Sequence, residues 1–347
     1  MNARHTDVAI VGGGIIGCSI GRLLASEGLD VTIIERAKIG REASYDAAGM
    51  LAPQAEIEFE GAFLDLCLES RGMYAALARE LFDEVGLDVW YRADGTLLLA
   101  FDEDETARLR ARAAAYERLG LDHELLTAVA ARRAEPALAP GLVAAVSVPG
   151  DHQVDNRKLV EALSLSCFAR GVHIIEHAPV RALARDDSGR ICGVETTLGR
   201  IAADTVIVAA GSWSNLVEDF PVPVEPVKGQ ILMLEMGSPP CRKVLRSERC
   251  YLVARIDGRV LVGATMERVG FDKSVSAKAV GSLLEAGREI APSLASAFGG
   301  EAWAGLRPAT PDGLPAVGPL EPGLLSATGH FRNGILLAPV TARIVVD

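Results

Sequence analysis

The chain has 347 residues, of which 49% are hydrophobic and 23% are charged, and its formal net charge is −11. This length favours two domains, and the negative charge argues against nucleic acid or an anionic membrane as a standing partner. No run approaches the ~18 apolar residues that a membrane span needs. The polar residues 1–6 lead directly into an apolar strand, so we expect no signal peptide and a cytoplasmic location.

The six cysteines are scattered along the chain without CxxC spacing. In a chain of this length they are predicted to be reduced and mostly buried, and not to form a disulfide framework or a zinc site. The six histidines form no pattern with them. We therefore expect no metal.

The first forty residues have the pattern of a nucleotide-binding unit. Residues 7–11 form an apolar run typical of a buried parallel strand, and the motif Gly-Gly-Gly-Ile-Ile-Gly follows at residues 12–17. A helical pattern continues to about Ser26, and a second apolar strand, residues 30–34, stops at Glu35. Strand, glycine motif, helix and acid together predict the βαβ unit of a dinucleotide site.

Each residue type in this unit has a physical role. Gly12 permits a tight turn, Gly14 lets the backbone approach a pyrophosphate, and Gly17 lets helix and strand pack closely. The start of the helix, at Ile15 and Ile16, supplies N–H groups to phosphates. Glu35 follows Gly17 by 18 residues and is placed to accept the hydroxyls of an adenosine ribose. A glycine-rich turn without a ligand is the alternative; otherwise the site binds FAD or NAD(H).

The downstream pattern favours FAD. An NAD enzyme would continue βαβα through a doubly wound sheet, whereas here a loop of small residues, 36–49, follows Glu35. Three strand patterns at residues 180–184, 191–196 and 203–211 form a β-meander that feeds a buried strand. The predicted fold class is α/β, with an FAD-binding Rossmann-like domain (βαβ with β-meander) and an α+β substrate domain with a mostly antiparallel sheet.

Two Asp-Gly pairs indicate hairpins in the second domain. Residues 90–93 are expected to turn at Asp94-Gly95 into residues 96–101, and residues 250–256 to turn at Asp257-Gly258 into residues 259–265. Two-residue loops of this composition favour type I′ turns and set the register.

The second hairpin makes a prediction about side chains. If Ile256 pairs with Arg259, Tyr251 lies opposite Ala264, and Met266 shares its face of the sheet. From the pattern alone, Tyr251 and Met266 are ordinary core residues.

We expect a discontinuous FAD-binding domain, residues 1–86, 144–220 and 305–347. The substrate-binding domain is expected to use residues 87–143 and 221–304. The sequence contains no internal repeat, and no flexible linker separates the two domains. We therefore expect the two domains to pack as one body.

Several segments resemble one family. The motif at residues 12–17 and Thr-Val-Ile-Val-Ala-Ala-Gly-Ser-Trp-Ser at 205–214 resemble the two-part FAD signature of the D-amino-acid oxidase and sarcosine oxidase superfamily. Residues 48–54, 305–315 and 329–337 resemble the glycine oxidases of the thiamine pathway. Relative to that family, the chain stops at Asp347 inside the helix expected from about Ile335, so its usual C-terminal end is expected to be missing. The loop 41–46 is also more polar than is usual beside a flavin.

The resemblance implies an FAD-dependent amine oxidase. Glycine or another small amine would lose a hydride to flavin N5, giving an imine that hydrolyses to glyoxylate and ammonia, while dioxygen becomes hydrogen peroxide. The imine would feed thiazole synthesis for thiamine. The alternatives are a D-amino-acid dehydrogenase, a sarcosine or D-amino-acid oxidase, and a subunit that carries FAD without catalysis. The expected partners are a small amino acid as substrate and dioxygen, and we expect no binding to nucleic acid or to a membrane. The resemblance to the family also suggests a homotetramer. No cysteine follows Cys250, so we expect FAD to be non-covalent.

The resemblance also implies the substrate-binding residues, namely Arg307, Tyr251, Met266, Arg332 and Met50. Arg307 would clamp the substrate carboxylate with its planar fork, although by pattern alone such an arginine pairs with an internal acid or reaches the surface. Tyr251 would add a hydrogen bond, and Arg332 either borders the pocket or is a solvated loop residue. We assign no acid–base residue.

The cofactor-binding residues follow from the glycine motif and the resemblance. His330 is expected to act through its backbone, and the first turn of the helix after Gly334 to point at the flavin C2=O edge. The expected set is Gly12, Gly14, Ile15, Ile16, Gly17, Glu35, Arg36, Ser44, Gly49, Met50, Val180, Ala210, Gly211, Trp213, Arg307, His330, Arg332, Asn333, Gly334 and Ile335.

Overall fold

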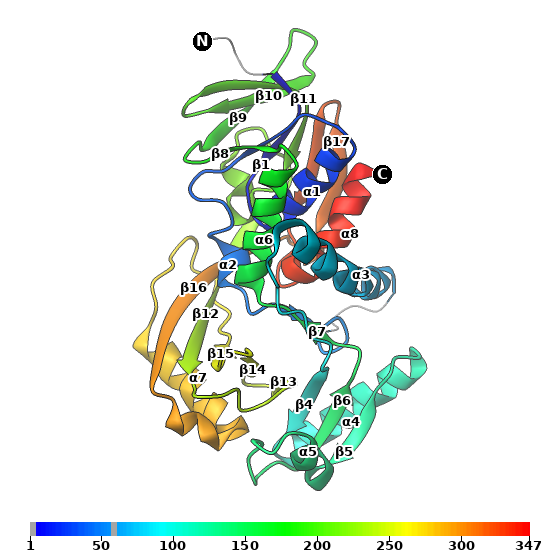
Figure 1. The fold of residues 1–347 in the computed structure, drawn as a ribbon, viewed down its shortest axis with the longest axis vertical. Coiled ribbons are helices and arrows are strands. Elements are labelled where there is room, and N and C mark those ends of the chain that lie inside the picture. The colour runs from blue at the N-terminus through cyan, green and yellow to red at the C-terminus, as the bar shows by residue number, and fades with distance from the viewer. Residues whose placement is uncertain (1–4, 57–60) are drawn as a thin grey trace.

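The computed structural model describes residues 5–56 and 61–347. Two eight-stranded sheets dominate the described part, one in the upper half of Figure 1 and one in the lower half. The first sheet has the order β17 (Ala316–Glu321), β18 (Leu324–Thr328), β11 (Gly199–Val208), β1 (His5–Val11), β2 (Val31–Ile34) and β8 (His173–Ile175). In addition, β10 (Ile191–Thr196) pairs with β11, and β9 (Val180–Arg185) pairs with β10.

The second sheet has the order β16 (Gly299–Ala309), β12 (Glu225–Glu235), β15 (Arg259–Gly263), β14 (Tyr251–Ala254), β13 (Val244–Arg246), β4 (Thr96–Ala100), β6 (Ala144–Val148) and β5 (Glu124–Thr127). Of its strand pairs, β4 with β13 is parallel and the others are antiparallel. A two-stranded ladder of β3 (Met50–Leu51) and β7 (His152–Gln153) lies between the two large sheets (Figure 1).

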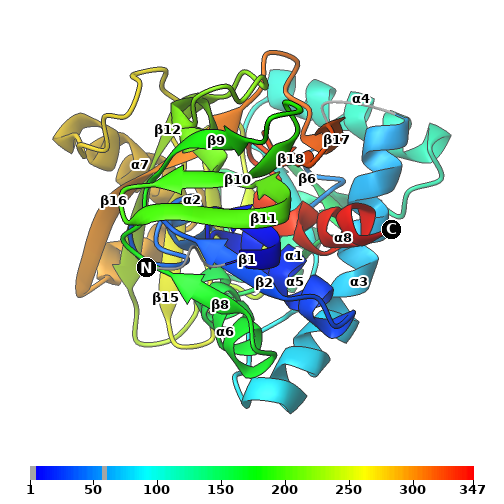
Figure 2. The ribbon, with the colours of Figure 1, turned by 90° about the horizontal axis from the view of Figure 1, so that it is seen from above.

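The helices are α1 (Ile15–Ser26), α2 (Ala43–Asp46), α3 (Ala62–Val85), α4 (Glu103–Arg118), α5 (Ala128–Ala134), α6 (Asn156–Ala169), α7 (Ala277–Ile290) and α8 (Gly334–Val346), with short 3₁₀ helices η1 (Gly211–Leu216) and η2 (Pro292–Ser296). Figure 2 shows α1, α3 and α8 gathered beside β1 and β2. Within the described residues, no helix combines the length and the apolar character that crossing a membrane requires.

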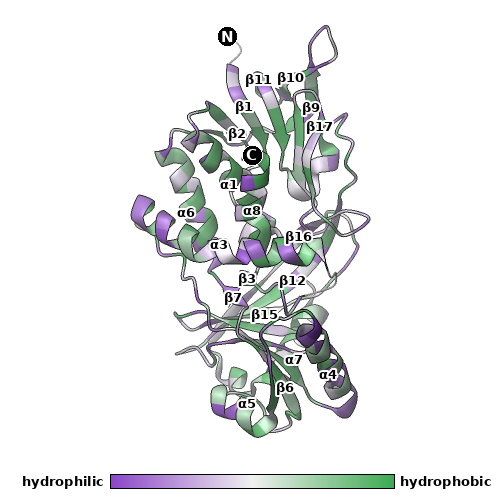
Figure 3. Ribbon diagram, turned by 90° about the vertical axis from the view of Figure 1, so that its right-hand side faces the viewer, coloured by the Kyte–Doolittle hydropathy of each residue, from purple (hydrophilic) through white to green (hydrophobic). Residues whose placement is uncertain are grey.

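Strand β1 is buried on both faces, which explains its apolar sequence. Ile10 belongs to a core cluster shared with α1, α6 and α8, whereas its neighbour Ala9 belongs to a cluster shared with β9, β10 and β11. Because successive residues of a strand point to opposite faces, helices cover one side of β1 and the meander covers the other. The apolar strands appear green in Figure 3, while the exposed α4 carries hydrophilic segments.

The predicted fold class is confirmed. Strand β1 pairs in parallel with β2 and β11, and β9, β10 and β11 form the antiparallel meander. The division into two domains stays a prediction, but two strands of the second sheet, β6 and part of β16, lie in the expected FAD-binding segments. Strand β6 starts at Ala144 and pairs within the second sheet, and β16 extends that sheet to Ala309.

The first predicted hairpin is wrong. Residues 90–93 do not pair with β4, because Arg92 instead makes backbone hydrogen bonds with Gln153 of β7. Its guanidinium bonds to Asp94 at 2.6 Å and to the carbonyl of Ala254 at 3.1 Å. This segment therefore connects the two sheets, and β4 pairs with β6 and β13.

The second hairpin exists, but its predicted register is wrong by one residue. Arg255 N–H donates to the carbonyl of Arg259 at 2.7 Å, so the loop holds three residues and Gly258 adopts a φ of +93°. Tyr251 consequently pairs with Gly263, not with Ala264.

Candidate active site

A large cavity lies where the parallel strands of the first sheet end. Strands β2, β1, β11 and β18 run in parallel, and the residues that follow their carboxyl ends line the cavity. This is the edge at which open α/β sheets bind ligands. The other wall is the second sheet, through β12, β14 and β16. About 1710 Å³ of space lies between the walls, its open parts included.

The glycine motif has the geometry that its sequence predicts. A Cβ on Gly12 would lie 2.5 Å from the carbonyl oxygen of Ala209, and one on Gly17 would lie 2.0 Å from that of Gly12, so both glycines allow close backbone packing. A Cβ on Gly14 would meet only the Ser44 hydroxyl, at 3.3 Å, because this residue faces the cavity.

The turn also presents hydrogen-bond donors. Ser44 Oγ accepts from Ile15 N–H at 2.9 Å, whereas the N–H groups of Gly14 and Ile16 make no hydrogen bond to any described residue. Free N–H groups at the start of a helix are a binding site for phosphate oxygens. These donors fit the pyrophosphate of a dinucleotide.

Glu35 is held at the end of β2 with its carboxylate toward the cavity. Its two oxygens accept from the N–H groups of Gly13 and Ala37 at 2.8 and 2.9 Å, and the residue is 7% exposed. Each carboxylate oxygen has a second lone pair available for a hydroxyl group. The carboxylate forms no ion pair with a described residue, so its negative charge is not neutralised. This charge would repel a phosphate, whereas the hydroxyl groups of a ribose can donate to it.

The polar loop between β2 and β3 is neutralised by cations from two parts of the chain. Lys273, from the segment before α7, bonds to Glu42 at 2.9 Å and to Asp46 at 3.1 Å, and Arg36 also pairs with Glu42. Burial raises the pKa of Asp46 to about 6, although Lys273 acts in the opposite direction. Arg36 stacks over Trp213 at 3.9 Å, so the two predicted cofactor residues lie together.

The first turn of α8 faces the same cavity. Gly334 and Ile335 line it, and the N-cap Asn333 makes no side-chain cap. An uncapped helix start has free N–H groups and favours negative charge. His330 is buried, its Nε2 lies 2.9 Å from Thr341 Oγ1, and burial lowers its pKa to about 4. Its ring is therefore neutral and engaged with α8, which argues against a role as a general base.

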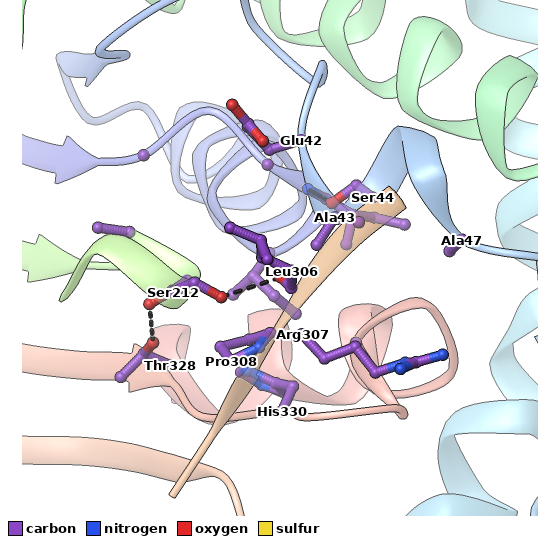
Figure 4. A pocket seen from close by; sticks show the side chains of 18 of the residues that line it. Glu42, Ala43, Ser44, Ala47, Ser212, Leu306, Arg307, Pro308, Thr328 and His330 are labelled. Atoms are coloured by element: carbon purple, nitrogen blue, oxygen red, sulfur yellow. Dashed lines mark hydrogen bonds between the residues drawn. The ribbon is translucent and has the colours of Figure 1, made fainter. Parts of the chain in front are cut away.

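Arg307 reaches the cavity from β16, as Figure 4 shows. Its Nη1 donates to the carbonyl of Thr265 at 3.1 Å, and no carboxylate among the described residues forms an ion pair with it. Burial lowers the pKa of Arg307, and the nearby Tyr251 and Glu56 act in the opposite direction. A partly buried cation without a carboxylate partner is suited to an anionic ligand.

Two glycines make room for the polar side chains at this end. A Cβ on Gly229 would lie 2.3 Å from the guanidinium nitrogens of Arg307, and one on Gly263 would lie 2.3 Å from the Tyr251 hydroxyl. Both side chains thus lie across glycines of the neighbouring strand. Ser212 donates to the carbonyl of Leu306 at 2.9 Å and ties η1 to β16 beside Arg307 (Figure 4).

Most predicted site residues meet in this cavity, whereas three do not line it. Met266 is 63% exposed and lies outside the lining, because β15 ends at Gly263 and the register differs from the predicted one. Gly17 and Asn333 are also not among the residues that line it. The predicted residues that line the cavity are Gly12, Gly14, Ile15, Ile16, Glu35, Arg36, Ser44, Gly49, Met50, Val180, Ala210, Gly211, Trp213, Tyr251, Arg307, His330, Arg332, Gly334 and Ile335.

The sequence interpretation missed two charged residues at the substrate end. Glu56 lines the cavity, and its carboxylate lies 2.5 Å from Nη1 of Arg246 on β13. Glu56 lies in an irregular segment with no periodicity that would place it. To find Arg246 from the sequence, one would have had to predict β13, because the pairing of β13 with β14 places Arg246 opposite Tyr251.

The chain is similar to known proteins over nearly its whole length. The model of the FAD dependent oxidoreductase (DAO) family matches residues 7–347. A glycine oxidase from Geobacillus kaustophilus is 37% identical over 98% of this chain and 92% of the relative. The crystal structure of glycine oxidase from the same organism matches with a TM-score of 0.94 at 36% identity, covering 99% of this chain and 94% of that chain.

Two further proteins are similar. A bifunctional protein ThiO/ThiG from Nostoc is 36% identical over 98% of this chain, and the chain spans about half of that relative, 52%. The crystal structure of an iminodiacetate oxidase from Chelativorans matches with a TM-score of 0.88 at 31% identity, covering 97% of this chain and 94% of that chain.

Proposed function

The chain belongs to the FAD dependent oxidoreductase (DAO) family, and from this premise we propose that it is an FAD-dependent amine oxidase that acts on glycine. Bound FAD supplies the acceptor for a hydride from the substrate Cα and passes the electrons to dioxygen. Glycine, dioxygen and water then yield glyoxylate, ammonia and hydrogen peroxide by way of an imine. We assign the reaction to thiamine biosynthesis, in line with the similarity to ThiO/ThiG.

The observation that carries this proposal is the continuity of one cavity. It extends from the glycine motif and Glu35 to Arg307, which has no carboxylate partner among the described residues. A dinucleotide that fills the first part leaves the Arg307 end for a small anionic substrate. Arg307 binds the carboxylate with two parallel N–H donors, and this fixes the orientation of the Cα–H bond.

Other residues complete the substrate end. The Tyr251 hydroxyl adds a hydrogen bond to the carboxylate, and Met50 and Arg332 border the same space. Burial raises the pKa of Tyr251 to about 12, so its hydroxyl stays protonated and can donate. The free N–H groups at the start of α8 would favour negative charge on a bound cofactor. No side chain is assigned as a general base.

The test is a screen for peroxide release with the purified holoprotein over glycine, sarcosine, D-alanine and D-proline. We expect glycine to be oxidised with stoichiometric release of hydrogen peroxide. Reduction of a quinone dye without oxygen consumption would instead identify a dehydrogenase. Bound FAD with no turnover of any amine would identify a subunit that carries the cofactor without catalysis.

Two finer points belong to the same proposal. We infer a homotetramer from the family resemblance, and light scattering of the purified protein measures its mass directly. The cytoplasmic location inferred from the sequence also stays a prediction.

A further inference from the structure

A row of polar side chains crosses the cavity-facing side of the second sheet. Arg246 of β13 pairs with Tyr251 of β14, and Tyr251 pairs with Gly263 of β15. Side chains directly opposite each other on neighbouring strands lie on the same face. Arg246 therefore lies beyond Tyr251 on the face that Tyr251 presents to the cavity.

Glu56 meets this row from the other side of the cavity. The N–H groups of Gln54 and Ala55 donate to the buried carboxylate of Asp151 at 3.2 and 3.1 Å, and Glu56 N–H donates to the carbonyl of Ala52 at 3.2 Å. This turn fixes the backbone from which the Glu56 side chain extends. Glu56 lines the cavity and pairs with Arg246 at 2.5 Å, with side-chain exposures of 12% and 23%.

Glu56 is close enough to the substrate end to influence it. Its charge acts on both Tyr251 and Arg307, the two residues that we assign to the substrate carboxylate. Arg246 and Arg307 thus both lie near Tyr251, but they differ in whether a carboxylate pairs with them. Arg307 has no carboxylate partner among the described residues, whereas Arg246 is neutralised by Glu56.

We propose that the Glu56–Arg246 pair is a specificity determinant that restricts the site to amines carrying a single carboxylate. The inference rests on the proposed function of the same cavity. A substrate with a second carboxylate has to place it near the negative charge of Glu56, and Arg246, the cation bonded to Glu56, is already paired. Like-charge contact of this kind selects against a ligand without improving the binding of the preferred one.

The test substrate is iminodiacetate, which is glycine with a second carboxymethyl group on its nitrogen. Its oxidation by the same reaction consumes one dioxygen and one water and yields glyoxylate, glycine and hydrogen peroxide. N-ethylglycine is the control substrate, because it has a similar size and no second charge. In the wild-type holoprotein we expect kcat/KM for iminodiacetate to be at least about tenfold below that for N-ethylglycine.

The test variant is Glu56→Gln, which keeps the shape of the side chain and removes its charge. With Arg246 no longer neutralised, kcat/KM for iminodiacetate relative to glycine should rise about tenfold or more. Adding Arg246→Gln to Glu56→Gln should abolish this gain, because the second carboxylate then has no cation to bind. Glu56→Asp keeps the charge and should keep the discrimination.

Glu248→Gln is the matched control. Glu248 forms an exposed pair with Arg108 away from the cavity, and its loss should leave the substrate ratio unchanged. FAD content and thermal stability of every variant are measured in parallel. Should Glu56→Gln fail to fold, the wild-type comparison of the two substrates and Glu56→Asp still decide the question.

Two results would overturn the inference. One is a wild-type enzyme that oxidises iminodiacetate as well as N-ethylglycine, and the other is an unchanged substrate ratio in a folded Glu56→Gln variant. A holoprotein that oxidises no amine contradicts the proposed function instead. In that case calorimetric binding constants for the same two ligands replace kcat/KM, and equal affinities for wild type and Glu56→Gln would refute the role of the pair.

Discussion

Two arginines, Arg255 in the loop after β14 and Arg307 on β16, illustrate how the surroundings of a residue decide its role. Arg255 is 3% exposed, and its guanidinium donates to the carbonyls of Val154 and Ala48, each at 2.7 Å, and to the side chain of Asn156 at 3.1 Å. Arg307 donates to one carbonyl only and faces the cavity. The first arginine is satisfied by the protein, and the second needs an anion.

Replacing Arg307 by alanine is therefore expected to weaken glycine binding. Loss of one partner of such a charged pair costs about 2–5 kcal/mol, so the glycine KM should rise roughly 30-fold or more. Arg307→Lys keeps the charge but loses the fork and should recover part of the loss. Steady-state kinetics with peroxide detection measure both variants. Arg288→Ala, at an exposed position of α7, is the control, and a near-normal KM in Arg307→Ala would place the clamp elsewhere.

A second prediction at this scale concerns the buried Asp151. Burial raises the pKa of its carboxyl to about 7, although the N–H groups of Gln54 and Ala55 donate to it. Between pH about 4 and 7 the folded state therefore keeps a proton that the unfolded state has released. The protonated Asp151 therefore adds to the free energy of unfolding below pH about 4, and this contribution is lost as the pH rises through 7. Its size is on the order of 4 kcal/mol.

Urea denaturation of wild type and Asp151→Asn at pH 5 and pH 8 measures this effect. Wild type should lose more stability than the variant between the two values. Identical pH dependence in the two proteins would show that Asp151 does not titrate in this range.

At the scale of elements, α8 shows how one helix is fixed by another. Pro339 lies inside α8 and has no N–H, so the carbonyl of Ile335 lacks its usual helical partner. The hydroxyl of Tyr74 on α3 donates to that carbonyl, and Ser70 donates to the carbonyl of Leu336 at 2.6 Å. These contacts position the start of α8, which faces the cavity.

Tyr74→Phe should therefore be destabilising. A buried carbonyl left without a donor costs about 1–3 kcal/mol, which chemical denaturation resolves. Because the lost contact is next to the first turn of α8, FAD affinity should fall together with stability. Tyr45→Phe is the control, since the Tyr45 hydroxyl makes no hydrogen bond to a described residue. Equal stability of Tyr74→Phe and wild type would mean that another donor satisfies Ile335.

At the scale of the whole molecule, the cavity exists because the two sheets face each other. The first sheet contributes the strand ends and α1, and the second contributes a face on which Arg307 and Tyr251 lie. The ladder of β3 and β7 and the buried Arg255 hold the connecting segment between them. The cofactor and the substrate thus meet at the boundary between two sheets.

This arrangement predicts that FAD is held without a covalent bond. Among the described residues, those that line the cavity include no cysteine and one histidine, His330, which is buried and bonded to Thr341. Acid precipitation of the yellow protein should leave the flavin in the supernatant. Colour that stays in the pellet would contradict this prediction.

The sequence by itself determined the parts of the molecule that depend on local patterns. The glycine motif, Glu35, the β-meander and the α/β fold class follow from apolar runs and turn residues that are adjacent along the chain. These features act over one or two elements, so their spacing carries the information. The family resemblance extended the interpretation to FAD and glycine.

Only the tertiary structure decided how distant segments meet. One extra residue in the loop at Gly258 moved Tyr251 opposite Gly263 and left Met266 exposed, and no local pattern distinguishes the two loop lengths. Glu56 and Arg246 are 190 positions apart and form an ion pair because a turn and a sheet face each other across the cavity. Such contacts depend on how separate elements pack together, and the periodicity of one chain segment does not predict which distant segments meet.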